Sequence, residues 1–190
     1  LRFGCPVPDT LLWSSERPAT LSLRLRNRIE SRDAEFYDFE VRLRTLEYKE
    51  GKFFVNNREC CIEWHELSPR ITLSELEQIY NQGVRNIRFT AGWVSDEMLN
   101  YCDTNGIYVA VTAPINTSHA GNLRTKGNNP SNDPKWREEY IKRTEEMIHT
   151  TKRHPSVIAY YLADDSANGI CLYESYLKAK EITSTPIFYE

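Results

Sequence analysis

The spacing of hydrophobic residues changes character once along the chain, close to residue 50. Before that point, in "TLSLRLRNRIE" (residues 20–30) and again in residues 36–51, apolar and charged positions alternate with a period of two. Leucines then line one face of a strand while arginines line the other, a pattern typical of antiparallel strands with one solvent-exposed face. We therefore expect residues 1–50 to form β-structure whose two faces differ in polarity.

Beyond residue 51 the pattern becomes an alternation of strand-like and helix-like segments. The stretch from Lys52 to Cys60 has the form of a hairpin with its turn at Asn56 and Asn57, and it leads into the first apolar strand. The pattern predicts strands over residues 58–66, 84–90, 107–114, 156–163 and 185–190, and helices over residues 72–83, 94–106, 133–154 and 171–182. Strands that are apolar on both faces and alternate with helices indicate parallel βαβ units with right-handed crossovers. The predicted domain division is residues 1–50 and residues 51–190.

Several helix ends carry local signals of their own. Thr72 with Glu75 three residues later predicts a capping box at the start of the first helix. Gly106, after Asn105, is a predicted helix stop, and Asp133 followed by a proline is a predicted helix start.

Composition and charge narrow the class of protein. Of the 190 residues, 40% are hydrophobic and 27% are charged, which is typical of a soluble globular protein, and every apolar run is shorter than the roughly 20 residues that span a bilayer. The net charge of -3 is spread over interleaved acids and bases. Nucleic acid and anionic membranes are therefore not expected as partners, and a neutral ligand is favoured. The cellular compartment stays open.

Four stretches, read in order, carry a resemblance to a known family. They are "PDTLLWSSERPATLSLRLRN" with "FYDFEVRLRTLEYKEGKFFVNNREC", then "NIRFTAGWVSDEMLNYCDTNGIYVAV", "RHPSVIAYYLADDSANG" and "TPIFYE". They resemble glycoside hydrolase family 2, the family of β-galactosidases and β-glucuronidases. The matching features there are the passage from sandwich to barrel, an N-x-V/I-R…CD-x-Y/N-G segment, an NHPS…NE segment and an RPV-x-Y strand.

This resemblance implies an α/β fold class with a partial (β/α)8 TIM barrel. Residues 51–190 would be the N-terminal half of the barrel, with about four to five strand-helix units. Residues 1–50 would be the C-terminal strands of an immunoglobulin-like β-sandwich. A closed eight-stranded barrel takes about 250 residues, so the later strands are not expected within this chain.

The resemblance also implies the position of the catalytic acid. In the family, an Asn-Glu pair after the fourth barrel strand binds the sugar 2-hydroxyl and serves as general acid/base; here these positions are Asp164 and Asp165. Asp is one methylene shorter than Glu, which leaves the proton of Asp165 roughly 1 Å short and costs on the order of a hundredfold in rate. A retaining glycosidase also needs a second carboxylate about 5 Å away as nucleophile. The family's nucleophile lies on the seventh strand, so we expect this chain to be inactive by itself.

Further substrate-binding candidates follow from the same resemblance. The full set is Asp164, Arg88, His65, Glu66, Trp93 and His119. Within "RFTAGW" the family's arginine is kept, but its sugar-contacting histidine is Ala91. The retained pair His65 and Glu66 is also explained by structural support, and that alternative is left open.

A metal site is not predicted. In β-galactosidases a Glu and a His after the third strand help to bind magnesium together with the acid/base Glu. Here the acidic positions are Thr112, Ala113 and Thr117, while His119 persists. His119 and Asp165 supply too few hard oxygen ligands for magnesium, so no metal or other cofactor is expected.

Three functional hypotheses remain at this point. The parent protein is a family 2 glycosidase of which this chain is an excised piece, or it has lost catalysis and keeps a carbohydrate-binding cleft lined by Trp93, Trp64 and Tyr161. The third is a structural module without a ligand. Core packing is the competing interpretation for Trp64 and Tyr161. The expected partners are carbohydrate and either the missing half of the barrel or a second copy of the chain, because open strand edges invite pairing.

Overall fold

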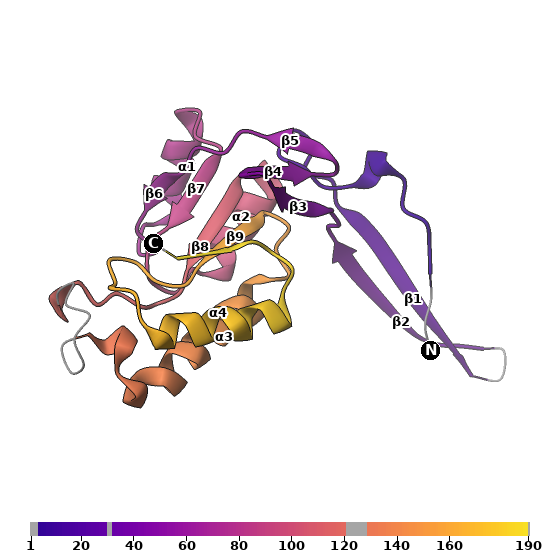
Figure 1. Ribbon diagram of the computed structural model, residues 1–190. Coiled ribbons are helices and arrows are strands. Elements are labelled where there is room, and N and C mark those ends of the chain that lie inside the picture. Colours follow the sequence, from indigo (N-terminus) through magenta and orange to yellow (C-terminus); the bar gives the residue numbers. More distant parts are fainter. Residues whose placement is uncertain (1–3, 30–31, 121–128, 190) are drawn as a thin grey trace.

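The computed structural model describes residues 4–29, 32–120 and 129–189 (Figure 1). A long antiparallel ribbon, a small antiparallel sheet and a parallel sheet with its helices follow one another along the chain. Short 3-10 turns, η1 (Asp9–Leu11), η2 (Ser118–Ala120) and η3 (Pro130–Asn132), lie in the connecting segments.

The ribbon consists of β1 (Leu21–Ile29) and β2 (Arg32–Val41), which pair antiparallel. Leu23 lies opposite Phe39, so apolar side chains share one face of the ribbon, as the alternation predicts. That face is more open than expected, with 50% of Leu23 exposed. The reason is visible in Figure 1, where the ribbon projects away from the parallel sheet.

A three-stranded antiparallel meander follows, made of β3 (Leu46–Lys49), β4 (Lys52–Val55) and β5 (Arg58–Cys60). Its second turn has Asn56 and Asn57 at φ 51° and 64°, which suits a two-residue hairpin and confirms the predicted turn. The predicted division at residues 50 and 51 falls in the first turn of the meander, so the division into two domains stays a prediction.

The parallel sheet contains, in the described part of the chain, β6 (His65–Leu67), β7 (Asn86–Phe89), β8 (Tyr108–Thr112), β9 (Val157–Tyr161) and β10 (Ile187–Phe188). The spatial order β6-β7-β8-β9-β10 equals the chain order, and every pairing is parallel. Sequential parallel strands joined through helices are the arrangement of the first part of a (β/α)8 barrel. The predicted fold class is confirmed.

The helices are α1 (Leu73–Asn81), α2 (Asp96–Asn105), α3 (Arg137–Thr151) and α4 (Ile170–Ile182). The predicted capping box is present: Thr72 Oγ1 accepts from the Glu75 amide while the Glu75 carboxylate accepts from the Thr72 amide. Gly106 ends α2 at φ 67°, and a Cβ there would lie 2.1 Å from the Ser15 carbonyl oxygen, so glycine is required. The third helix begins later than predicted, because residues 134–136 form a 3-10 turn, η4 (Pro134–Trp136).

Two apolar clusters lie on the two sides of the sheet. On one side, side chains such as Phe89, Val111 and Leu162 pack against the helices. On the other side, Tyr108 and Ile158 pack against the meander and Trp13. The sheet is therefore covered on both faces, as parallel sheets require.

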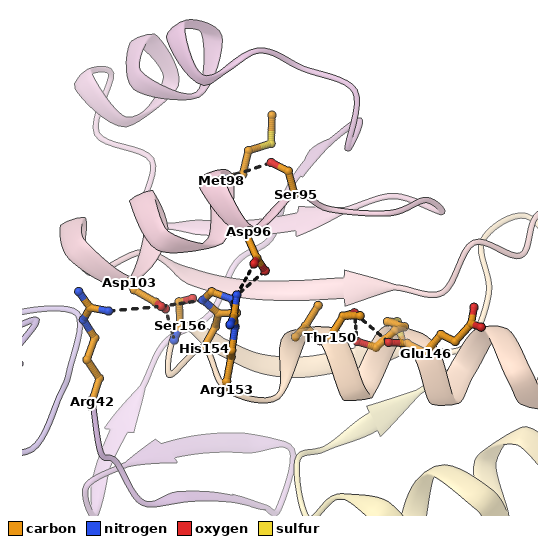
Figure 2. A network of polar contacts seen from close by, with 12 residues as sticks. Arg42, Ser95, Asp96, Met98, Asp103, Glu146, Thr150, Arg153, His154 and Ser156 are labelled. Atoms are coloured by element: carbon orange, nitrogen blue, oxygen red, sulfur yellow. Dashed lines mark hydrogen bonds and ion pairs between the residues drawn. The ribbon is translucent and has the colours of Figure 1, made fainter. Parts of the chain in front are cut away.

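A polar network joins three of the stretches that carried the family resemblance (Figure 2). Asp103 of α2 is 2% exposed; its Oδ2 lies 2.8 Å from His154 Nδ1 and its Oδ1 accepts from the Ser156 amide at 3.1 Å. The carbonyl oxygen of Asp103 accepts from Trp13 Nε1 at 2.7 Å, and Arg42 Nη1 lies 3.9 Å from its carboxylate. The buried carboxylate is thus satisfied by several partners, and it fixes α2, the start of β9 and the N-terminal segment relative to one another.

Within the described residues, none of the helices combines the length and the apolar character needed to cross a bilayer.

Candidate active site

The carboxyl ends of β6, β7 and β9 meet at one guanidinium group. Arg88 of β7 is 4% exposed, and its Nη1 donates to Glu66 Oε1 at 3.0 Å. Its Nη2 donates to Asp164 Oδ1 at 3.3 Å, and its Cζ lies 4.0 Å from the centroid of the Tyr161 ring. One buried cation therefore holds a carboxylate of β6 and one that follows β9, which fixes the geometry of this end of the barrel.

Asp164 is oriented by more than the arginine. The Ala91 amide donates to its Oδ2 at 3.4 Å, and its own amide donates to the Ile115 carbonyl oxygen at 2.9 Å. An ionised carboxylate only accepts hydrogen bonds. The family has an Asn at this position, whose amide donates to a sugar hydroxyl. Asp164 can only accept, and its oxygens already accept from Arg88 and the Ala91 amide.

Asp165 follows directly but has a different environment. Its φ of 43° lies in the left-handed region, which Asp tolerates better than most residues because of its short polar side chain. The side chain is exposed, and its Oδ2 accepts from Asn116 Nδ2 at 3.5 Å. The two adjacent carboxylates are therefore held by different partners, and Asp165 is the one open to solvent.

The two predicted histidines are both exposed. His65 precedes Glu66 on β6, and because side chains alternate along a strand, it is directed to the opposite face of the sheet. His119 is an exposed residue of η2, in the loop after β8. The structure thus brings together Glu66, Arg88 and Asp164 from the predicted set, with Asp165 beside them.

Trp93 is 52% exposed in the loop after β7 and lines a hollow of about 620 Å³. The neighbouring Gly92 allows close contact between loops, because a Cβ there would lie 2.5 Å from Pro69 Cγ. The other aromatic candidates are packed. Tyr161 is 8% exposed beside Phe188, and Trp64 is half-buried against Phe53.

The residues do not fit a magnesium ion. Thr112 and Ala113 occupy positions where β-galactosidases have acids. Thr112 ends β8, Ala113 follows it directly, and both residues are buried. In the described part of the chain, there is no cluster of three or more His, Cys, Asp or Glu side chains that would hold a metal ion.

Sequence reasoning missed Asn116 and the Ala91 amide, the groups that hold the two aspartates. A usable signal was present, because the carboxyl ends of adjacent parallel strands share one edge of the sheet. Residues just after β8 must then lie beside those just after β9. The backbones of Asn116 and Asp164 indeed form a parallel β-bridge.

Comparisons with known proteins agree with this fold. A family model described as glycosyl hydrolases family 2, TIM barrel domain, matches residues 47–190. The chain is 28% identical to the β-galactosidase of Psychromonas ingrahamii, over 97% of this chain and 19% of that protein. It is 24% identical to the β-galactosidase of an Arthrobacter species, over 94% of this chain and 18% of that protein. The chain therefore spans about a fifth of the length of these relatives.

A third relative is the β-galactosidase large subunit of Lactobacillus acidophilus, with 26% identity over 83% of this chain and 28% of that protein. Among solved structures, the crystal structure of Ruminococcus gnavus β-glucuronidase superposes with a TM-score of 0.75 at 17% identity, over 93% of this chain and 32% of that one. Bacteroides uniformis β-glucuronidase 3 superposes with a TM-score of 0.69 at 18% identity, over 94% of this chain and 24% of that one. The fold is thus shared with part of these enzymes.

Proposed function

The chain belongs to glycoside hydrolase family 2, and from this premise we propose that it supplies the acid/base half of a retaining glycosidase. The substrates would be β-galactoside- or β-glucuronide-type O-glycosides. The observation that carries the proposal is the pair after β9: Asp164 is fixed by Arg88, while Asp165 is exposed at the same end of the sheet. An exposed carboxyl group beside a fixed cluster is accessible to a glycosidic oxygen.

The chemistry divides between two carboxyl groups. Protonated Asp165 donates its proton to the glycosidic oxygen as the bond from that oxygen to the anomeric carbon breaks and a nucleophilic carboxylate bonds to that carbon. Asp165 then takes a proton from the water that hydrolyses the glycosyl-enzyme. Arg88 and the Ala91 amide keep the adjacent Asp164 in place.

The nucleophile is proposed to come from outside this chain. The described residues provide five parallel strands, whereas a closed barrel has eight and the family's nucleophile belongs to the seventh. We expect no detectable turnover by these residues alone. Association with the missing barrel half is supported by the relative named a large subunit, a name that implies assembly from more than one chain.

The test compares Asp165→Ala and Asp165→Glu in the longest polypeptide that contains these residues, with alkyl and dinitrophenyl β-galactosides and β-glucuronides as substrates. Asp165→Glu should raise the rate on the order of a hundredfold, since it restores the reach of the acid. Asp165→Ala should lower kcat by about a hundredfold or more for alkyl glycosides, which need leaving-group protonation, and much less for dinitrophenyl glycosides.

Equal effects on both leaving groups would contradict the assignment of Asp165. Hydrolysis by the 190-residue chain alone that disappears in Asp165→Ala would contradict the proposed division of the two carboxylates.

A second candidate function is carbohydrate binding without catalysis. The two aspartates favour it, because the Asp164 carboxylate, held by Arg88, cannot donate to the sugar 2-hydroxyl, and Asp165 is a shortened acid. A full-length protein that binds galactosides or glucuronides and does not hydrolyse them, even as Asp165→Glu, would establish this alternative.

A further inference from the structure

We infer that Ser166 and Asn116 are positioning residues for Asp165, because they tie the segment after β9 to the loop after β8 by hydrogen bonds in place of a metal ion. The effect of these contacts on catalysis rests on the proposed function, whereas the contacts themselves do not. The two segments are adjacent because β8 and β9 pair in parallel and leave the sheet at the same edge, where the backbones of Asn116 and Asp164 form a bridge.

One hydroxyl group joins the two segments. Ser166 Oγ accepts from the Thr117 amide at 3.0 Å and donates to the Asp164 carbonyl oxygen at 2.9 Å. A serine hydroxyl can do both, because it has one proton to donate and two lone pairs that accept. The bond to Asp164 spans Asp165, since it links the residue before it to the residue after it. Ser166 therefore fixes the backbone on both sides of Asp165 and anchors it to the neighbouring loop.

The backbone conformation of Asp165 depends on such support. Its φ of 43° lies in the left-handed region, which residues other than glycine seldom occupy. A residue stays in this region where its surroundings hold it there. The Asp164 amide adds a further contact by donating to the Ile115 carbonyl oxygen at 2.9 Å. Contacts made by its neighbours thus hold the backbone from which the Asp165 side chain projects.

Asn116 provides the contact to the Asp165 carboxylate itself. Its Nδ2 donates to Asp165 Oδ2 at 3.5 Å. The orientation of this amide is set within its own loop, because Asn116 Oδ1 accepts from the Ser118 amide at 3.1 Å and from Ser118 Oγ at 2.8 Å. With the amide oxygen bound there, the amino group is left for the carboxylate. Asn116 therefore restricts where the Asp165 carboxylate lies.

These hydrogen bonds replace what the resemblance to β-galactosidases assigns to magnesium. At the positions of the acids that would hold the ion between the two segments, this chain has Thr112, Ala113 and Thr117. Thr117 instead contributes its backbone amide, and Ser166 provides the acceptor. Amide and hydroxyl groups make these contacts without a cation. We therefore expect the position of Asp165 to be independent of divalent metal ions.

The first test measures hydrogen exchange at the Thr117 amide by mass spectrometry, in the longest polypeptide that contains these residues. Ser166→Ala removes the acceptor, so this amide should exchange about tenfold faster, whereas Ser166→Thr keeps a hydroxyl and should restore the protection. A chelator should leave the wild-type rate unchanged. Ser14→Ala is the matched control, because the hydroxyl of Ser14 also accepts from a backbone amide, that of Arg17, but in the N-terminal segment.

The second test is kinetic and uses alkyl and dinitrophenyl β-galactosides and β-glucuronides. Ser166→Ala and Asn116→Asp should each lower kcat for the alkyl glycosides by about tenfold with KM unchanged, because a displaced acid protonates the leaving group poorly. Dinitrophenyl glycosides, which need little protonation, should be hydrolysed at nearly the wild-type rate. Ser166→Thr should recover most of kcat, and Ser14→Ala should match the wild type.

Equal exchange at Thr117 in the wild type and Ser166→Ala would overturn the inference, as would a chelator that accelerates this exchange as much as Ser166→Ala does. So would an equal loss of kcat for both leaving groups in Ser166→Ala while Asp165→Ala distinguishes them.

A different result marks failure of the proposed function. If Asp165→Ala does not distinguish the leaving groups, or if the protein hydrolyses none of these glycosides even as Asp165→Glu, the proposed function fails and the positioning role fails with it. The exchange rate at Thr117 still decides whether the hydrogen bonds join the two segments.

Discussion

Asp164 and Asp165 are adjacent in the sequence and have separate partners in the structure. Arg88 and the Ala91 amide hold Asp164, while Asn116 contacts Asp165, whose φ of 43° turns the backbone between them. Two like charges in one site would repel each other in a low dielectric. The different partners relieve that conflict and leave Asp165 exposed to solvent.

At the residue scale, Tyr160 gives a prediction for alkaline pH. Burial raises the pKa of Tyr160 to about 12, and its hydroxyl lies 3.1 Å from Thr151 Oγ1. The folded state thus keeps a proton that the unfolded state loses above its ordinary pKa of about 10, so stability is complete below that pH and falls as pH rises toward 12. Tyr160→Phe should lessen this fall by about 1.4 kcal/mol per pH unit over that interval.

The measurement is the free energy of unfolding from urea titrations between neutral pH and the onset of alkaline unfolding. Tyr173→Phe, at an exposed tyrosine of α4, is the control and should leave the slope unchanged. Identical slopes for the wild type and Tyr160→Phe would show that Tyr160 does not contribute.

Residue-scale prediction from the sequence succeeded where the signal is local or carried by a motif. Gly106, the cap at Thr72 and the position of Asp165 after β9 belong to this group. A motif does not show side-chain direction. The family resemblance names His65 together with Glu66, whereas strand alternation sends the two side chains to opposite faces.

At the scale of elements, the spacing of hydrophobic residues along the chain is enough to separate the antiparallel region from the parallel one. The strands β8 and β9 are buried throughout, which is the pattern that predicts a sheet covered on both faces. The start of α3 was placed too early, because Pro134 after Asp133 signals a first turn without showing whether that turn is α or 3-10. Element type was thus predictable, whereas boundaries depended on tertiary contacts.

The capping box of α1 gives the prediction at this scale. Thr72→Ala should lower the free energy of unfolding by about 1 kcal/mol, since the Glu75 amide loses its acceptor. Thr104→Ala is the matched control, because that hydroxyl only bonds back to the Asn100 carbonyl oxygen within α2 and its loss should cost little. The comparison uses urea midpoints at constant slope; a loss in Thr104→Ala as large as in Thr72→Ala would remove the cap from the explanation.

At the scale of the whole molecule, the two faces of the parallel sheet are covered, whereas its edges and one face of the ribbon are open. The meander and Trp13 close one face of the parallel sheet and the helices close the other. The edges at β6 and β10 have unpaired backbone on one side within the described sheet, and the ribbon exposes Leu23, Leu25 and Phe39 on one face. Open edges and apolar faces of this kind promote association.

We therefore predict that the 190-residue chain sediments as oligomers at micromolar concentration. Leu23→Lys should shift the distribution toward monomer, because it places a charge on the apolar face of the ribbon. Ser22→Lys adds the same charge on the opposite face, where Arg24 and Asp38 already form an ion pair, and should leave the distribution unchanged. If both variants dissociate the oligomer equally, net charge rather than the apolar face controls association. If Leu23→Lys has no effect while the wild type is oligomeric, the contact lies at the edges of the parallel sheet. A monodisperse wild-type monomer would show that neither surface drives association.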